Sequence, residues 1–180
     1  MAGKFTAERL GREEKTQMIL FFHGFESSLP SGKVDVLNDF GLNAIGLPMN
    51  YDTDNPYLQA LDFTVMSQPK LIVGSSMGGY LALKIGTHLN IPLILLNPAL
   101  VRRPISFDEP IEYGHHRPKI WSLLGAQDDL IPFKENEEEL FKFGAIVEVG
   151  GHGHRTPNDV FRNYIHGIIG ELGLMIETIN

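Results

Sequence analysis

The sequence contains no cysteine in its 180 residues. This absence excludes a disulfide scaffold, a cysteine nucleophile, thiolate zinc sites and iron–sulfur clusters. It also fits the reducing environment of the cytoplasm. If the protein works by covalent catalysis, its nucleophile must be another residue type.

Basic residues and long apolar runs are also scarce. There are 15 Lys and Arg against 22 Asp and Glu, which gives a net charge of −7. No dense basic cluster is present, so we expect no nucleic-acid partner. The most apolar run, residues 91–96, is far too short to span a bilayer, and residues 1–17 lack the apolar core of a signal peptide. The sequence therefore predicts a cytoplasmic protein with no membrane partner.

The length and composition indicate one globular domain. Apolar residues make up 43% and charged residues 21%, close to the averages for soluble domains. The sequence has no internal repeat, low-complexity tract or linker-like change in composition. We expect a polar N-terminal extension over residues 1–17 and a single domain over residues 18–180.

Short apolar runs alternate with longer segments of helical spacing. This alternation predicts an α/β fold with a mostly parallel sheet of about six strands and helices on both faces. The expected strands are residues 18–22, 43–47, 71–73, 93–96, 120–124 and 145–149. The expected helices are residues 33–40, 56–67, 77–89, 133–143 and 157–172. Ligands of such sheets bind beyond the carboxyl ends of the strands, so the loops after the strands are the place to look for chemistry.

The loop after the third run carries a Gly-x-Ser-x-Gly motif. Gly74, Ser76 and Gly78 stand between a predicted buried strand and a predicted helix. In this context the central serine lies on a strained turn that exposes its hydroxyl, and the glycines let strand and helix pass closely. Ser75 does not fit, because Val73 and Met77 would flank it. The motif therefore predicts Ser76 as a nucleophile.

An activated serine needs a base, an orienting acid and donors for the oxyanion. Asp128 and Asp129 follow the run that ends at residue 124, and His152 and His154 follow the last run. The aspartate would hold the imidazole in the correct tautomer so that it can accept the serine proton. Capping of the next helix is the competing role for either aspartate.

Two backbone amides are candidates for the oxyanion hole. The Met77 amide lies at the start of a predicted helix, directly after Ser76. The Phe25 amide belongs to the turn after the first run, where Gly24 permits an unusual backbone path. His23 precedes this turn and is predicted to be a structural, hydrogen-bonding residue.

Together these elements resemble the α/β-hydrolase superfamily, and more narrowly the small YqiA-type esterases, once grouped as an uncharacterised protein family. The resemblance extends from residue 18 to about residue 172 and rests on the segments 23–28, 74–80 and 97–99 and on the late Gly-Gly-His loop. It implies a compact α/β-hydrolase without a large cap, and a carboxylesterase acting on short acyl chains. The extra segment 1–17 departs from the family, whose members begin almost at the first strand.

The resemblance also ranks the alternatives for the acid and the base. Gly125, Asp128 and Pro132 match the Gly-x-x-Asp pattern with a proline four residues later, which favours Asp128 over Asp129. The superfamily often has glycine directly before its catalytic histidine, which favours His154 and leaves His152 as the alternative base. Arg155 is not the small or apolar residue expected next, so both histidines stay open.

We expect no metal and no cofactor. The paired histidines His115 and His116 have no third ligand at a fixed spacing, and no His-Glu-x-x-His helix is present. Segment 101–117 is the only long insertion near the predicted site, and it either closes over the pocket or crosses the surface.

The leading functional hypothesis is a serine hydrolase that cleaves short-chain esters of small molecules through an acyl-enzyme. A thioesterase or an acyltransferase would use the same residues. A third reading is a protein-binding module with a vestigial site, since fold alone does not fix function. The sequence supplies a candidate for each member of the triad, whereas a decayed site should have lost one.

Overall fold

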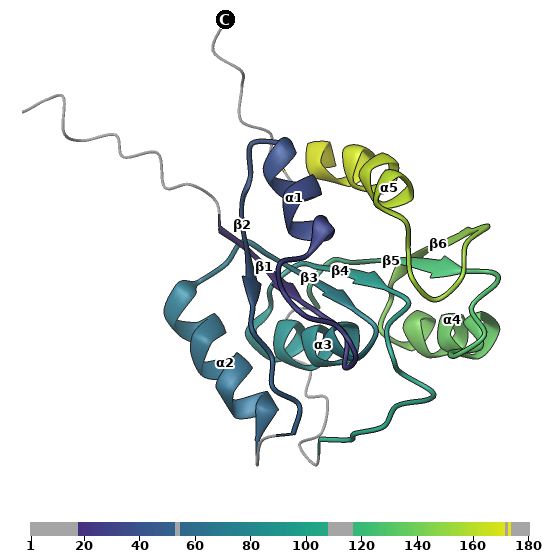
Figure 1. The fold of residues 1–180 in the computed structure, drawn as a ribbon, viewed down its shortest axis with the longest axis horizontal. Coiled ribbons are helices and arrows are strands. Elements are labelled where there is room, and N and C mark those ends of the chain that lie inside the picture. Colours follow the sequence, from purple (N-terminus) through teal and green to yellow (C-terminus); the bar gives the residue numbers. More distant parts are fainter. Residues whose placement is uncertain (1–17, 53–54, 108–116, 172, 174–180) are drawn as a thin grey trace, which may run out of the picture.

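Six parallel strands form one sheet in the order β2-β1-β3-β4-β5-β6 (Figure 1). The computed structural model describes residues 18–52, 55–107, 117–171 and 173. The predicted extension 1–17 and the pair His115–His116 lie outside the described residues. The strands are β1 Met18–Phe22, β2 Asn43–Leu47, β3 Leu71–Ser75, β4 Leu93–Leu96, β5 Ile120–Gly125 and β6 Ile146–Gly150.

Five helices cover both faces of the sheet. They are α1 Gly32–Asp39, α2 Pro56–Ser67, α3 Met77–Leu89, α4 Phe133–Lys142 and α5 Asn158–Glu171. Helices α1 and α5 lie on one face, and α2, α3 and α4 lie on the other (Figure 1). The prediction of a parallel α/β sheet of about six strands with helices on both faces is therefore confirmed.

Local sequence signals explain where the elements begin and end. Helix α2 begins at Pro56, whose missing N–H costs nothing at the first helical position, and the Asn55 side chain accepts the Leu58 amide at 2.9 Å. Helix α3 ends at Leu89, and the C-cap residue Asn90 adopts a left-handed conformation with φ of 57°. The predicted bounds of β1, β2, β4, α2 and α3 agree with the structure, and the others differ by one or two residues.

The central strands form the core, and the edge strand β6 is partly exposed. All four residues of β4 are buried, as expected for a strand covered on both faces. Strand β6 lies at the sheet edge beside β5 alone, and Ile146 and Val149 are 53% and 41% exposed. An apolar residue in a strand is therefore not necessarily buried when only one neighbouring strand pairs with that strand.

The strand order reverses between β1 and β3, which pair with each other in the middle of the sheet. At such a switch point the loops after the two strands run in opposite directions and leave a crevice at the carboxyl ends. The loop after β1 contains Phe25, and the turn after β3 contains Ser76. The topology thus brings two of the predicted site segments to one crevice.

Candidate active site

Ser76 occupies a strained turn between β3 and α3. Its backbone has φ of 54° and ψ of −121°, a conformation that costs a non-glycine residue on the order of 1–3 kcal/mol. Close packing fixes this turn: a Cβ on Gly78 would lie 2.1 Å from the carbonyl oxygen of Phe22 in β1. The glycine lets α3 pass against β1, and the serine projects from the turn between strand and helix.

A chain of hydrogen bonds joins Ser76, His154 and Asp128. The Nδ1 atom of His154 lies 2.8 Å from Oδ2 of Asp128, and its Nε2 lies 2.9 Å from Oγ of Ser76. A carboxylate only accepts, so Nδ1 donates to Asp128, and Nε2 of a neutral ring is left to accept the Ser76 hydroxyl proton. The Asp128 side chain is 1% exposed and the His154 side chain 15%. The pair is therefore held apart from bulk water, with its basic nitrogen aimed at the serine.

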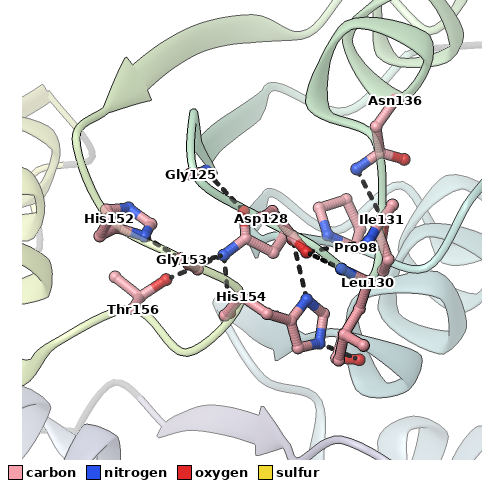
Figure 2. A network of polar contacts seen from close by, with 12 residues as sticks. Pro98, Gly125, Asp128, Leu130, Ile131, Asn136, His152, Gly153, His154 and Thr156 are labelled. Carbon is pink, nitrogen blue, oxygen red and sulfur yellow. Dashed lines mark hydrogen bonds and ion pairs between the residues drawn. The ribbon is translucent and has the colours of Figure 1, made fainter.

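Asp128 also shapes its own loop (Figure 2). Its Oδ1 accepts the amides of Leu130 and Ile131 at 2.9 Å and 2.8 Å, while Oδ2 faces His154. One oxygen of the carboxylate therefore holds the turn, and the other faces the histidine. Helix α4 has Pro132 at its N-cap and no side-chain capping bond, so neither aspartate caps that helix.

Asn97, directly after β4, links the loops that carry the acid and the base. Its Nδ2 donates to the carbonyl oxygens of His154 at 2.7 Å and Gly153 at 3.2 Å, and its Oδ1 accepts the Gly125 amide at 2.7 Å. Asn97 is 1% exposed and has φ of 41°, which asparagine tolerates better than most residues. The sequence analysis quoted Asn97 only as part of a family resemblance. Its place directly after a buried strand was the available signal.

The alternative base, His152, lies elsewhere. Its ring is buried, and Nδ1 lies 2.8 Å from the carbonyl oxygen of Gly153. Figure 2 shows this ring well separated from that of His154. The Nε2 atom of His152 has no hydrogen-bond partner among the described residues. The structure brings His154 to Ser76, and it does not bring His152 there.

The two predicted oxyanion donors flank the serine. Met77 is the first residue of α3, so its amide has no acceptor within the helix. The turn after β1 touches the serine, because a Cβ on Gly24 would lie 3.1 Å from Cβ of Ser76. Phe25 follows this glycine and lines the same cavity as Ser76 and Met77.

His23 supports the turn that contains Phe25. Its Nε2 accepts the Met49 amide at 3.1 Å, so Nδ1 carries the proton and donates to the Gly24 carbonyl oxygen at 2.8 Å. The Tyr51 hydroxyl donates to the His23 carbonyl oxygen at 2.6 Å. Burial raises the pKa of the Tyr51 hydroxyl well above its ordinary value. Both ring nitrogens of His23 are therefore engaged in holding the loop.

A cavity of about 490 Å³ opens at Ser76 and His154. Met77, Ala99, Leu130 and Ile131 supply apolar lining, and Arg102, Arg103, Arg155 and Glu26 supply charge. The sequence analysis did not single out Arg102 and Arg103. Their adjacent positions at the start of the insertion after β4 were the available signal.

The described part of the insertion packs against α3. The ring of Phe107 stacks on Tyr80 at 5.5 Å with an interplanar angle of 6°, and the Lys84 ammonium donates to the Phe107 carbonyl oxygen at 3.1 Å. These contacts anchor the segment whose residues 102–104 line the cavity. Residues 108–116 lie outside the described residues, so the choice between a lid and a surface crossover stays open for them.

Neither a metal site nor a membrane-spanning helix is found among the described residues. No group of three His, Asp or Glu side chains there is arranged to hold a metal ion. None of the helices in that same part of the chain has the length and apolar character needed to cross a membrane.

Residues 18–109 match the model of a family described as an uncharacterised protein family, UPF0227. The UPF0227 protein YcfP of Escherichia coli O9:H4 (strain HS) is 25% identical, over 78% of this chain and 92% of that protein. The YcfP protein of Shigella boydii serotype 18 has the same identity and coverage.

Solved structures of α/β-hydrolases share the fold. Est1E from Butyrivibrio proteoclasticus aligns with a TM-score of 0.70 at 15% identity, over 88% of this chain and 89% of that chain. Alpha/beta hydrolase domain-containing protein 10 from mouse gives 0.66 at 18% identity, over 88% and 91%. The esterase domain of a Rhodothermus marinus protein gives 0.62 at 14% identity, over 90% and 88%. The chain has the α/β-hydrolase fold and belongs to the UPF0227 family.

Proposed function

We propose that the protein is a serine hydrolase that cleaves short-chain carboxylic esters through an acyl-enzyme. The observation that carries this proposal is the unbroken chain of hydrogen bonds from Ser76 through His154 to Asp128 at a cavity of about 490 Å³. The similarity in fold to the esterase domain of a Rhodothermus marinus protein supports the same reaction class, ester hydrolysis. A vestigial site would have lost one of these three side chains.

In the first half-reaction the Ser76 oxygen attacks the ester carbonyl carbon while its proton passes to Nε2 of His154. The carbonyl oxygen becomes an oxyanion, which the Phe25 and Met77 amides stabilise. Asp128 stabilises the imidazolium through Nδ1. The C–O bond then breaks, and the departing alkoxide takes the proton from Nε2.

In the second half-reaction a water molecule attacks the acyl-Ser76 ester, with His154 again accepting the proton. Collapse of the second oxyanion releases the carboxylic acid and returns the proton to the serine oxygen. The cavity has room for a short acyl chain, and its apolar lining of Met77, Leu130 and Ile131 suits one.

The test is a burst assay on short p-nitrophenyl esters with Ser76→Ala, His154→Ala and His152→Ala. Loss of Ser76 or His154 should lower kcat by roughly 10⁴–10⁶-fold, because neither the nucleophile nor its base can be replaced by water. His152→Ala is the matched control, since the same side chain is removed from a buried position away from Ser76. It should keep most of the turnover.

Unchanged turnover in Ser76→Ala would contradict the proposal as a whole. An inactive His152→Ala beside an active His154→Ala would show that the base is assigned to the wrong histidine. Circular dichroism of each variant separates loss of chemistry from loss of fold.

A further inference from the structure

The charged lining of the cavity is mainly cationic, opposite in sign to the whole chain. Among the described residues, Arg102, Arg103 and Arg155 line it beside a single carboxylate, that of Glu26, whereas the chain carries a net charge of −7. Three guanidinium groups around one reactive serine create a local positive field that the acidic surface elsewhere does not provide. Such a field selects for negative charge on the bound molecule.

Arg103 is held in a fixed orientation. Its Nε donates to Oγ of Ser106 at 3.0 Å, its Nη1 donates to the Leu100 carbonyl oxygen, and its guanidinium lies 4.5 Å from the centre of the Tyr80 ring. A guanidinium has five N–H donors, and these two bonds use two of them. The remaining N–H donors of Arg103 lie in the plane of a guanidinium group whose position is already fixed. Binding an anion there therefore costs less conformational entropy.

The segment that carries Arg102 and Arg103 is itself anchored. The Phe107 ring stacks on Tyr80, and the Lys84 ammonium lies 5.7 Å and 5.9 Å from the centres of the Tyr80 and Phe107 rings. The same ammonium also donates to the Phe107 carbonyl oxygen. Lys84 is 2% exposed, so this contact is buried on α3. The two arginines therefore stand on a supported wall of the cavity.

Arg155 comes from a different loop, directly after His154. Its side chain is exposed, and so is that of Arg102. Neither side chain makes a hydrogen bond or ion pair with another of the residues described here. Within the described part of the chain, two arginines that no carboxylate neutralises thus border the cavity from the loops after β4 and β6.

We infer that the ester substrate carries an anionic group, a carboxylate or a phosphate, which Arg102, Arg103 and Arg155 bind while Ser76 attacks the ester carbonyl. This inference rests on the proposed serine-hydrolase function. Guanidinium groups match the two oxygens of carboxylate and phosphate with paired N–H donors, which a neutral acyl chain cannot use. The anion fixes the ester relative to the serine, and most of the selectivity appears in kcat/KM.

The test compares matched pairs of esters. The first pair is mono-p-nitrophenyl glutarate and p-nitrophenyl valerate, which differ by a terminal carboxylate on acyl chains of equal carbon number. The second pair is 4-acetoxybenzoate and its methyl ester, which place the carboxylate on the leaving group. The wild type should prefer the anionic member of at least one pair by about tenfold in kcat/KM, the effect of a hydrogen bond to a charged group.

The variants are Arg102→Gln, Arg155→Gln and the double variant, which keep side-chain length and remove the charge. Each single change should reduce the preference, and the double variant should reduce it further, because only Arg103 then remains to bind the anion. Lys70→Gln is the matched control: it removes one positive charge at an exposed site at the opposite end of β3. Competition by glutarate or by inorganic phosphate distinguishes the two anion classes.

Equal kcat/KM within both pairs in the wild type, or a preference that is undiminished in the double variant, would overturn the inference while leaving ester hydrolysis intact. Failure of the proposed function looks different, because then neither member of any pair would be hydrolysed in a Ser76-dependent manner. High salt provides a further check: it should reduce the preference for the anionic ester, because exposed charges are screened.

Discussion

Asn97 connects three parts of the site with one buried side chain. Its amide group binds the carbonyl oxygens of Gly153 and His154, and its carbonyl oxygen binds the Gly125 amide where the Asp128 loop begins. The donor and acceptor ends of an asparagine are needed at once, so neither aspartate nor leucine can replace it. We regard Asn97 as a positioning residue for the proposed base.

Asn97→Ala should lower kcat by about tenfold to a hundredfold with little change in KM, because the His154 loop loses two of its anchors and the ring drifts from Ser76. It should also reduce the free energy of unfolding by about 1–3 kcal/mol, since buried groups lose their partners. The comparison is with Ser122→Ala, which removes a buried hydrogen bond to the Leu95 carbonyl oxygen between β4 and β5. Equal kcat losses in the two variants would contradict a positioning role.

Asp128 is the second residue whose atoms have separate tasks. Asp128→Asn keeps one acceptor oxygen for the Leu130 and Ile131 amides but places an NH₂ group against Nδ1 of His154. The ring must then carry its proton on Nε2, where it cannot accept from Ser76, so kcat should fall by about 10⁴-fold. Thermal unfolding should change little.

Asp129→Asn is the control for this charge change, because Asp129 is exposed and stands next to Asp128. Its kcat should equal that of the wild type. An Asp128→Asn protein with wild-type kcat would show that the carboxylate serves the turn alone.

At the scale of elements, the connection from β3 to α3 depends on close backbone contact. A methyl group on Gly78 would lie 2.1 Å from the carbonyl oxygen of Phe22, the last residue of β1. It would lie 2.5 Å from the carbonyl oxygen of His23, in the loop after β1. The helix cannot move away without moving the serine turn. Strand β1, helix α3 and the turn at Ser76 therefore have to move together.

Gly78→Ala should therefore destabilise the protein by about 3 kcal/mol or more, a size typical of overpacking against rigid backbone. Gly167→Ala in α5 is the matched control, because a Cβ there meets nothing within 4 Å. That change should stabilise the helix by roughly 0.5–1 kcal/mol. Urea denaturation of both variants checks the pair, and similar effects from the two would contradict the close-contact account.

At the scale of the whole molecule, two buried tyrosines couple stability to alkaline pH. Burial raises the pKa of Tyr51, and burial together with the negative charge of Glu148 raises that of Tyr164. In the unfolded chain both ionise near the ordinary value of 10.0. The folded state thus prefers the protonated forms, and the stability they contribute is complete below pH 10 and is lost as the pH rises further.

Tyr51→Phe isolates one of these contributions. Between about pH 8 and about pH 11 the wild type should lose roughly 1 kcal/mol more unfolding free energy than the variant, because phenylalanine has no proton to release in the unfolded state. At about pH 8 the free energy of unfolding of the variant should be lower than that of the wild type by about 1 kcal/mol, because the variant lacks the hydrogen bond to the His23 carbonyl oxygen. Parallel pH profiles in urea denaturation would contradict the assignment to Tyr51.

The sequence predicted those features that depend on neighbours along the chain. Hydrophobic periodicity predicted the elements, because helix and strand patterns repeat within a few residues. The Gly-x-Ser-x-Gly spacing predicted the turn at Ser76, because the strained backbone and the close packing of Gly78 are local requirements. The sequence also indicated the candidate acid and base, because each lies in a loop that directly follows a predicted strand.

Only the tertiary structure decided what depends on residues far apart in the sequence. It brought His154 rather than His152 to Ser76, across 78 positions of the chain, because the Asn97 side chain holds the His154 loop at the end of β4. It placed β6 at the sheet edge, where Ile146 and Val149 are partly exposed. It also gathered Arg102, Arg103 and Arg155 around one cavity of an acidic protein. No local pattern encodes these contacts, because packing and strand order determine which loops meet.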